Sequence, residues 1–105
     1  MFRLGYYHIY YRDGSEEKVE ILWGENIGPC EIANIFATDD FYEGESSADF
    51  HCEETVFTCE FEDKEDKRYY RFVIPTDKAV DRVVPELFEE YRDRVLISRV
   101  DIVNP

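Results

Sequence analysis

One short stretch of the sequence places a histidine, a thiol and two carboxylates next to one another. His51 is followed directly by Cys52, Glu53 and Glu54. These residue types could ligate a metal or form a nucleophile–base pair. Neighbouring residues on a strand point to opposite faces, so His51 and Cys52 would need a third group from elsewhere, and the sequence nominates none. We therefore predict no catalytic residue, no metal and no cofactor. A small enzyme or ligand-binding domain that uses His51 and Cys52 is kept as an alternative.

The rest of the sequence contains no motif for catalysis or for ion binding. There is no glycine-rich phosphate loop, no GxSxG and no HExxH. An EF-hand loop that began at Asp39 would have its glycine at Gly44, as that motif requires. Its third and twelfth positions, however, are Phe41 and His51, where oxygen ligands are needed. The motif therefore fails at two of its ligand positions.

Negative charge is concentrated in the middle of the chain. The 105 residues include 25 Asp and Glu against 12 Lys and Arg, which gives a net charge of −13. Residues 39–66 alone hold twelve acidic residues and one basic residue, a net charge of −11. Such a segment repels nucleic acid and anionic membranes and attracts basic partners. Solubility alone would favour dispersed charges, because crowded like charges repel one another.

Aromatic residues are interleaved with the acids in residues 39–54, which read DDFYEGESSADFHCEE. Grooves that hold nucleic acid neutralise phosphates and stack bases, so carboxylates and aromatic rings together can imitate that ligand. We expect a small acidic inhibitor that binds a basic, nucleic-acid-binding protein, as anti-CRISPR or anti-restriction proteins do. A toxin-immunity-type binding protein is an alternative, and an acidic face kept for solubility is the simplest one.

The predicted partner-binding surface consists of acidic and aromatic residues from this segment and from the strand expected after it. Glu60 and Glu62 are two residues apart, which on one strand face corresponds to roughly 6.6 Å, a spacing comparable with that of phosphates along a single strand. The predicted residues are Asp39, Asp40, Phe41, Tyr42, Glu43, Glu45, Asp49, Glu53, Glu54, Glu60 and Glu62.

Composition indicates one folded domain spanning residues 1–105. The apolar share is 44% and the aromatic share is 16%, too high for a disordered acidic tail. No apolar run has the length of a membrane span, and the N-terminus lacks the features of a signal peptide. We therefore expect a cytoplasmic protein. Its three cysteines, Cys30, Cys52 and Cys59, are predicted to be free thiols because their number is odd and their spacing fits no metal site.

The first half of the chain predicts a hairpin followed by a helix. Strands over about Phe2–Arg12 and Glu16–Trp23 flank the turn signal Asp13-Gly14. Pro29 suits the first turn of a helix, and the apolar spacing that follows predicts a helix over Pro29–Ala37. A long loop should then lead into a strand that begins at about Phe50 and continues to Glu62.

The second half predicts a strand, a long helix and a final strand. Alternation over Lys67–Pro75 indicates a strand. An apolar stripe from Val80 to Val95 predicts a helix that Pro85 kinks or divides. Leu96–Val103 reads as the last strand. The resulting ββαββαβ order predicts an α+β two-layer sandwich, with an antiparallel or mixed sheet of about five strands and both helices on one face.

Pairs of consecutive tyrosines recur within the predicted strands. Each pair should place one ring on each face of its sheet, so one face would carry exposed tyrosines beside charged residues. Tyrosine is favoured at protein interfaces, but it also covers solvated sheet faces, and both interpretations stay open. The pairs are Tyr6-Tyr7, Tyr10-Tyr11 and Tyr69-Tyr70.

Overall fold

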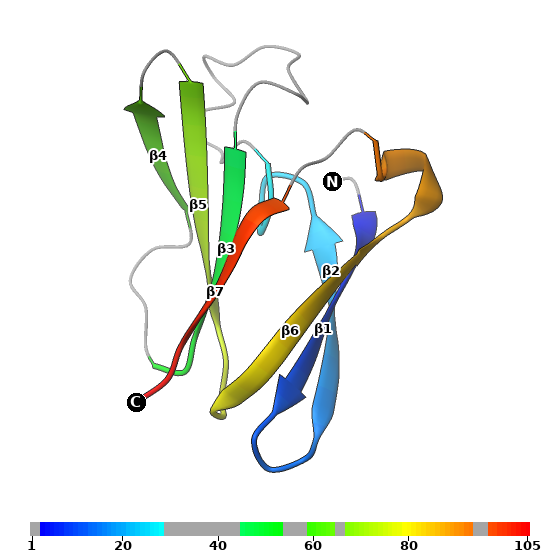
Figure 1. Ribbon diagram of the computed structural model, residues 1–105, viewed down its shortest axis with the longest axis vertical. Helices are drawn as coiled ribbons and strands as arrows, with labels where there is room; N and C mark the ends of the chain where they lie inside the picture. Colours follow the sequence, from blue (N-terminus) through cyan, green and yellow to red (C-terminus); the bar gives the residue numbers. More distant parts are fainter. Residues whose placement is uncertain (1–2, 29–44, 54–58, 65–66, 94–96) are drawn as a thin grey trace.

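The computed structural model describes residues 3–28, 45–53, 59–64, 67–93 and 97–105. These residues form seven strands in two sheets, with one short 3-10 helix and no α-helix (Figure 1). The elements are β1 (Arg3–Tyr11), β2 (Glu16–Leu22), β3 (Glu45–His51), β4 (Cys59–Lys64), β5 (Lys67–Pro75), β6 (Val80–Leu87), η1 (Glu89–Tyr91) and β7 (Ile97–Val103).

The smaller sheet has the strand order β2-β1-β6, and both pairings are antiparallel. The β1–β2 hairpin forms as predicted, because Gly14 adopts the positive φ of 90° that its turn needs. The Ser15 N–H donates to Asp13 Oδ1 at 2.8 Å and closes the turn. Alternation along β1 then buries Tyr7, Ile9 and Tyr11 on one face and leaves the other face partly exposed.

The larger sheet has the order β4-β5-β3-β7. β3 is parallel to both of its neighbours, whereas β4 and β5 form an antiparallel hairpin. Ser46, Ser47, Ala48, Asp49 and Phe50 are all buried, which is typical of a central strand covered on both faces. On β5, Tyr70, Phe72 and Ile74 lie on one face and are all buried, and Val73 on the other face is buried as well.

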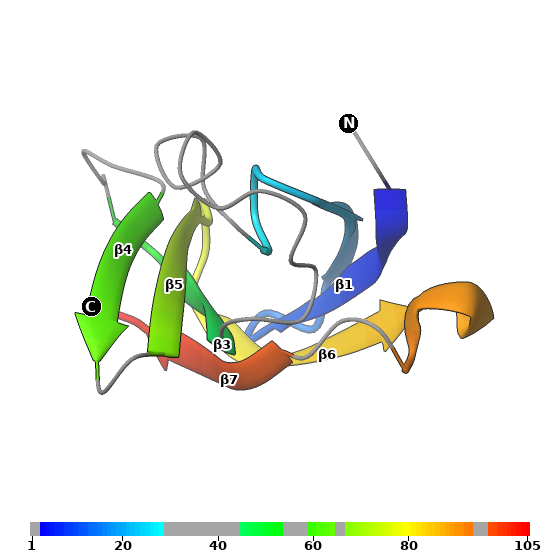
Figure 2. The same ribbon diagram turned by 90° about the horizontal axis from the view of Figure 1, so that it is seen from above.

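The two sheets meet where β6 lies beside β7 and diverge from that junction (Figure 2). The side chain of Asn104 fastens the junction: its Oδ1 accepts the Val80 N–H at 2.9 Å, and its Nδ2 donates to the Val80 carbonyl at 2.8 Å. The core fills the space between the sheets. Within it, the Tyr7 ring packs edge-on against Phe50 at 5.2 Å, and the Tyr7 hydroxyl donates to the Asn26 carbonyl.

The predicted α+β sandwich is wrong, and its clearest helix is a strand. Val80–Leu87 forms β6 and pairs with β1. The apolar spacing suggested a helix, but consecutive valines favour a strand, and Pro85 cannot donate the hydrogen bond that a helix interior requires. Val84 belonged to the apolar stripe that was expected to be buried, yet it is 44% exposed. The only helix after β6 in the described chain is the three-residue η1.

Other predictions about the fold have mixed outcomes. The first hairpin, β5 and the final strand are confirmed within one or two residues. The predicted helix 29–37 lies outside the described residues. β3 begins at Glu45, where a loop was expected, because a strand buried on both faces shows no alternation to read.

The prediction of free thiols is wrong for one cysteine. Cys59 is disulfide-bonded, Cys52 is a free thiol and Cys30 lies outside the described residues.

Among the residues that the structure describes, no helix is long and apolar enough to cross a membrane.

Candidate protein-binding surface

The structure places only part of the predicted partner-binding surface. Glu45 opens β3, Glu60 and Glu62 lie in β4, and Glu53 is exposed just after β3. The other predicted residues apart from Asp49 lie outside the described residues: Asp39, Asp40, Phe41, Tyr42, Glu43 and Glu54.

β5 brings three of the predicted acids together from distant parts of the chain. Its register places Glu45 of β3 and Glu62 of β4 as the cross-strand neighbours of Tyr69. One step along the same strands, Arg71 lies between Ser47 and Glu60. The register thus brings acidic positions of β3 and β4, which are 15 or more residues apart in the sequence, beside one pair of β5 residues.

Asp49 has a structural role. Its side chain is 5% exposed, and its Oδ2 accepts a hydrogen bond from Arg71 Nε at 2.6 Å. Arg71 Nη1 also donates to Glu60 at 3.2 Å, so one guanidinium bridges β3 and β4. The hydrogen bond with Asp49, with smaller contributions from both carboxylates, raises the pKa of Arg71. Because Asp49 is buried and paired, we leave it out of the surface that a partner would touch.

β4 is an edge strand of the larger sheet, since it pairs only with β5 in the described part of the chain. Glu60 is half-buried, with 38% of its side chain exposed beside Arg71. Its charge is thus partly balanced within the protein. Asp49, Glu60 and Arg71 together still carry a net charge of −1, so this part of the sheet stays acidic.

His51 and Cys52 do not assemble a reactive site within the described residues. His51 ends β3, and the Cys52 N–H donates to the Val103 carbonyl at 3.0 Å. His51 Nε2 is buried and has no hydrogen-bond partner among the described residues, so no base is aimed at the thiol there. The same residues contain no group of three or more His, Cys, Asp and Glu that could hold a metal. The enzyme alternative therefore gains no support.

The outer face of the smaller sheet carries a row of aromatic residues that basic residues cover. Lys18 Nζ lies 4.1 Å from the centre of the Tyr6 ring. The Arg82 guanidinium lies 4.3 Å from the centre of the Tyr10 ring. Between them on β1, His8 Nε2 is 3.7 Å from a carboxylate oxygen of Glu86. Sequence reasoning found the tyrosines but not these cations, which come from the strands on either side. This pairing favours a solvated, charge-balanced face over an aromatic binding platform.

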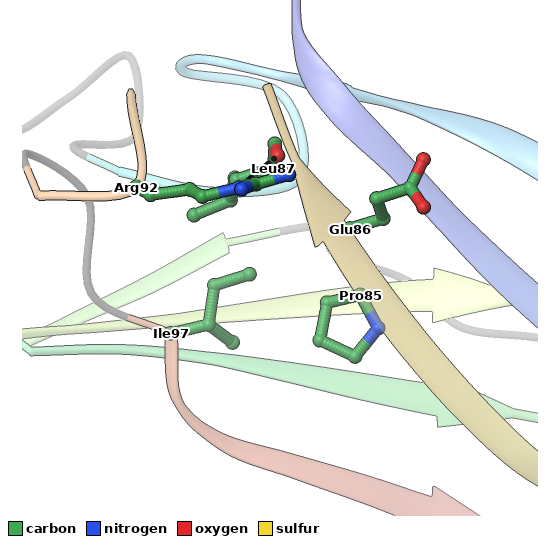
Figure 3. Close-up of a pocket in the computed structure, with 5 residues that line it drawn as sticks. All are labelled: Pro85, Glu86, Leu87, Arg92 and Ile97. Carbon is green, nitrogen blue, oxygen red and sulfur yellow. Dashed lines mark hydrogen bonds between the residues drawn. The ribbon is translucent and has the colours of Figure 1, made fainter. Parts of the chain in front are cut away.

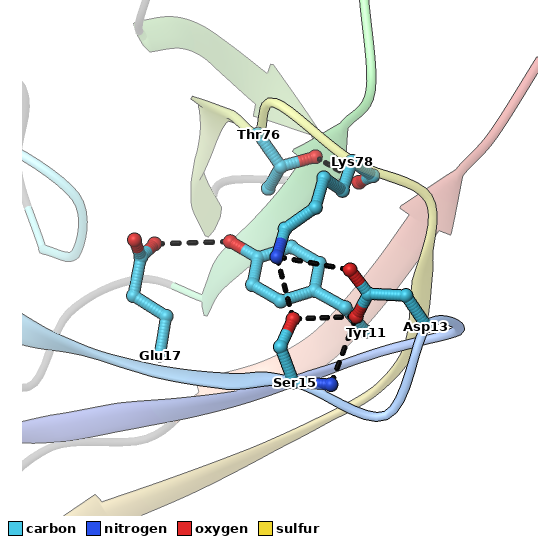
Figure 4. Close-up of polar contacts among 6 residues, drawn as sticks. All are labelled: Tyr11, Asp13, Ser15, Glu17, Thr76 and Lys78. Carbon is cyan, nitrogen blue, oxygen red and sulfur yellow. Dashed lines mark hydrogen bonds and ion pairs between the residues drawn. The ribbon is translucent and has the colours of Figure 1, made fainter.

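The tip of the first hairpin is held by a polar cluster (Figure 4). Lys78, from the turn before β6, contacts Asp13 at 3.1 Å and also donates to the Ser15 hydroxyl. The Ser15 hydroxyl, with help from the Ser15 N–H and Lys78, lowers the pKa of Asp13 to about 2. Burial, followed by the hydrogen bond to Glu17, raises the pKa of Tyr11 to about 12. The cluster ties the β1–β2 turn to the β5–β6 connection. Asp13 and Lys78 are exposed, so the cluster stabilises the hairpin tip and forms no enclosed site.

One hollow of about 400 Å³ lies between the end of β6 and the start of β7 (Figure 3). Arg92 borders it, and its Nε donates to the Leu87 carbonyl at 3.2 Å. The remaining lining is Pro85, Glu86, Leu87 and Ile97. An arginine at the border does not suit a basic partner.

A second hollow, of about 360 Å³, lies between β2 and the end of β5. Its walls are mainly apolar, with two carboxylates, Glu20 and Glu25, among the lining residues. The other lining residues are Val19, Leu22, Asn26, Val73, Ile74 and Pro75. This hollow combines negative charge with apolar walls, the combination that a basic peptide with apolar residues would need.

Comparisons with protein families, with curated proteins and with solved structures found no match to this chain.

Proposed function

We propose that this protein is a small acidic binding protein that inhibits a basic, nucleic-acid-binding protein by occupying its nucleic-acid groove. The observation that carries the proposal is the distribution of charge: residues 39–66 have a net charge of −11 out of −13 for the whole chain. The β5 register supports it, because Glu45 and Glu62 are the cross-strand neighbours of Tyr69, and Glu60 is that of Arg71. No catalytic step is part of the proposal.

The chemistry of such an inhibitor follows from its charge. A cluster of carboxylates attracts a basic groove over a distance of about 10 Å at 0.1 M salt, and it accelerates the encounter. Carboxylates then replace phosphates, and the aromatic residues interleaved in 39–54 take the place of stacked bases. A toxin-immunity protein would use the same surface against a basic toxin, so the identity of the partner separates these two alternatives.

The cytoplasm is the proposed place of action, since nucleic-acid-binding enzymes work there. The disulfide of Cys59 would be unusual in that compartment, because the cytosol keeps most thiols reduced. We expect Cys59 to react with an alkylating reagent in intact cells if the protein acts in the cytoplasm. Mass spectrometry of the alkylated protein measures this, and a Cys59 that stays protected would contradict the proposed location.

Capture of the partner at low salt tests the proposed function. Three baits are compared: the wild type, an acid-segment variant and a matched control with the same change in net charge. The acid-segment variant replaces six residues with Asn or Gln: Asp39, Asp40, Glu43, Glu45, Glu53 and Glu54. The control replaces six exposed acids elsewhere: Asp77, Asp81, Glu86, Glu89, Glu90 and Asp93. Asp49 is left unchanged in all three, because its loss would leave Arg71 without its buried partner.

A nucleic-acid-binding protein that the wild type and the control retain, and that the acid-segment variant loses, is the expected result. A salt step should release it, since the attraction is electrostatic. Equal capture by all three baits would contradict the proposal, because total charge and not the segment would then be responsible. Circular dichroism of the three baits confirms that each one is folded.

A further inference from the structure

The outer edge of β2 has backbone groups that no strand pairs with in the described part of the chain. In an antiparallel pair, alternate residues turn their N–H and C=O groups toward the partner strand. The Tyr11 N–H donates to the Ser15 carbonyl at 2.9 Å, which fixes that alternation. It follows from the register that Glu17 and Val19 bond to β1, whereas the backbone groups of Glu16, Lys18 and Glu20 point away from the sheet.

Asn26 closes one end of this edge. Its Oδ1 accepts the Leu22 N–H at 2.8 Å, and its Nδ2 donates to the Glu20 carbonyl at 2.8 Å. The Leu22 carbonyl accepts the N–H groups of Glu25 and Asn26. Asn26 thus imitates an added strand over two residues. Asn26 makes no hydrogen bond to the outward-facing backbone groups from Glu16 to the N–H of Glu20.

The hollow of about 360 Å³ adjoins the same edge. A strand added beside β2 would direct alternate side chains toward Val19 and the apolar walls from Val73, Ile74 and Pro75. The remaining side chains would lie beside Glu16, Lys18 and Glu20 on the outer face. The site therefore favours a segment in which apolar residues alternate with polar ones.

Charge decides which kind of segment fits. Glu16, Glu17, Glu20 and Glu25 are exposed along or beside the edge. Two cations offset them in part: Lys18, and Arg3, whose Nη1 lies 2.9 Å from Glu20 Oε1. These six residues keep a net charge of −2. A second copy of this chain would bring an equally acidic β2 and a net charge of −13 to the same place, which repulsion opposes. A basic segment is attracted instead.

We propose that the outer edge of β2 binds an extended basic segment of the partner by strand addition. Apolar side chains of that segment enter the hollow beside Val19, and its Lys or Arg side chains lie near Glu16 and Glu20. This inference rests on the proposed function and adds a second, backbone-mediated contact to it. Main-chain hydrogen bonds supply affinity, while the hollow and the glutamates select the sequence.

Synthetic peptides test this mode of binding without altering the protein. The parent probe is acetyl-Lys-Val-Lys-Val-Lys-Val-Lys-amide, labelled with a fluorophore. Two further probes are N-methylated on the lysine residues or on the valine residues, and anisotropy titrations measure the affinity of all three. The backbone N–H groups of only one of these two sets can face β2, whichever way the peptide runs.

One methylated probe should lose at least about tenfold in affinity, and the other should stay within about threefold of the parent. Equal affinities of the two methylated probes, or a parent probe that does not bind, would overturn strand addition. The variant Lys18→Pro should also lose the parent probe, because the proline ring replaces an N–H of the outer edge. Its circular dichroism spectrum shows whether it stays folded.

The capture experiment separates this inference from the proposed function. If the partner is captured as expected but the two methylated probes bind equally, the acid segment alone carries recognition and the strand-addition inference fails. If neither the partner nor the parent probe binds, both proposals fail. If the two methylated probes bind the wild type unequally and Lys18→Pro also loses affinity for the partner, the β2 edge is part of the complex with that partner.

Discussion

The two edge strands of the smaller sheet differ in how far their outward-facing backbone groups are blocked or hydrogen-bonded. Along β6, Pro85 occupies a position whose backbone faces away from β1, so this edge lacks an N–H there. The side chain of Asn104 occupies both backbone groups of Val80, and β7 lies alongside. Along β2, the described residues close only the end near Leu22, through Asn26. Exposed edges invite pairing with other chains, and natural proteins usually blunt them.

In the proposed mode of binding, the unpaired backbone groups of β2 are kept for a partner strand, whereas those of β6 are not. Charged side chains protect β2 from other acidic copies, but they do not protect it from basic segments. The outer face between the two edges adds no net attraction, since Lys18 and Arg82 cover its tyrosines. Recognition of a basic partner is therefore expected at the β2 edge and in the acid segment, and not on the tyrosine face.

The largest effect should come from moving a proline by one residue along β2. Val19→Pro removes an N–H that the register turns toward β1 and should cost roughly 3 kcal/mol or more of unfolding free energy. Lys18→Pro removes an N–H that points outward and should cost less than about 1 kcal/mol. Urea unfolding followed by circular dichroism measures both. Equal costs would mean that the assigned alternation is wrong.

Removing the amide that closes β2 should have the next largest effect. In Asn26→Ala the Leu22 N–H and the Glu20 carbonyl lose their partners, and Asn26 is only 8% exposed. Each lost hydrogen bond is worth about 1 kcal/mol, so a loss of about 2 kcal/mol is expected. Asn26→Asp serves as the control, because it keeps the acceptor for Leu22 and removes the donor for Glu20. A loss below the error of chemical unfolding would show that water replaces both bonds.

Asn104→Ala applies the same test to the β6 edge. The lost bonds are both to Val80, at 2.9 and 2.8 Å, but Asn104 is partly exposed, so water can replace part of them. We expect a cost of about 1 kcal/mol, smaller than that of Asn26→Ala. Thermal unfolding of the two variants side by side gives the order. A larger cost for Asn104→Ala than for Asn26→Ala would contradict the view that burial of Asn26 makes its hydrogen bonds the more important ones.

A smaller effect is expected from pH, through the cluster at the hairpin tip. The pKa of Tyr11 is about 12 in the folded chain against 10.0 for an ordinary tyrosine. The folded state therefore holds its proton more tightly, and this stabilisation is complete below pH 10 and is lost as pH rises from 10 to 12. Tyr11→Phe should flatten the fall in stability over that window, measured by urea unfolding at several pH values. An unchanged slope would contradict the assigned cause.

Asp13, in the same cluster, gives stability the opposite dependence on pH. The pKa of Asp13 is about 2 against 3.8, so its stabilisation is present above pH 3.8 and is lost as pH falls from 3.8 to 2. Asp13→Asn should remove this dependence while leaving the β1–β2 register intact. Amide exchange of the hairpin residues, measured at pH 4 and pH 2.5, follows the change. Protection of the wild-type hairpin that is identical at both values would count against the cluster.

Local signals in the sequence predicted the parts of the fold that depend on neighbours in the chain. Asp13-Gly14 located the first hairpin, and alternation over Lys67–Pro75 assigned β5. The stripe from Val80 was misread because valines at those spacings fit both a helix and a strand. Only the pairing of β6 with β1, some 75 residues away, decides between them.

The candidate site depends still more on contacts between distant residues. Asp49 looked like one surface acid among many, but its partner Arg71 is 22 residues away on β5. No local pattern reports that pairing, or the burial that follows from a central parallel strand. The cations over Tyr6 and Tyr10, and the open edge of β2, likewise follow from strand order. The concentration of acids in residues 39–66 was the one feature of the site that the sequence showed directly.

Displacement of nucleic acid from the captured partner tests the central claim most directly. The partner is first bound to a labelled oligonucleotide, and this protein is then titrated in at low salt. The account predicts that the wild type and the matched control release the oligonucleotide, while the variant neutralised in the acid segment does not. A stable complex that contains the partner, the oligonucleotide and this protein together would contradict it, because the acid segment would then not occupy the nucleic-acid groove.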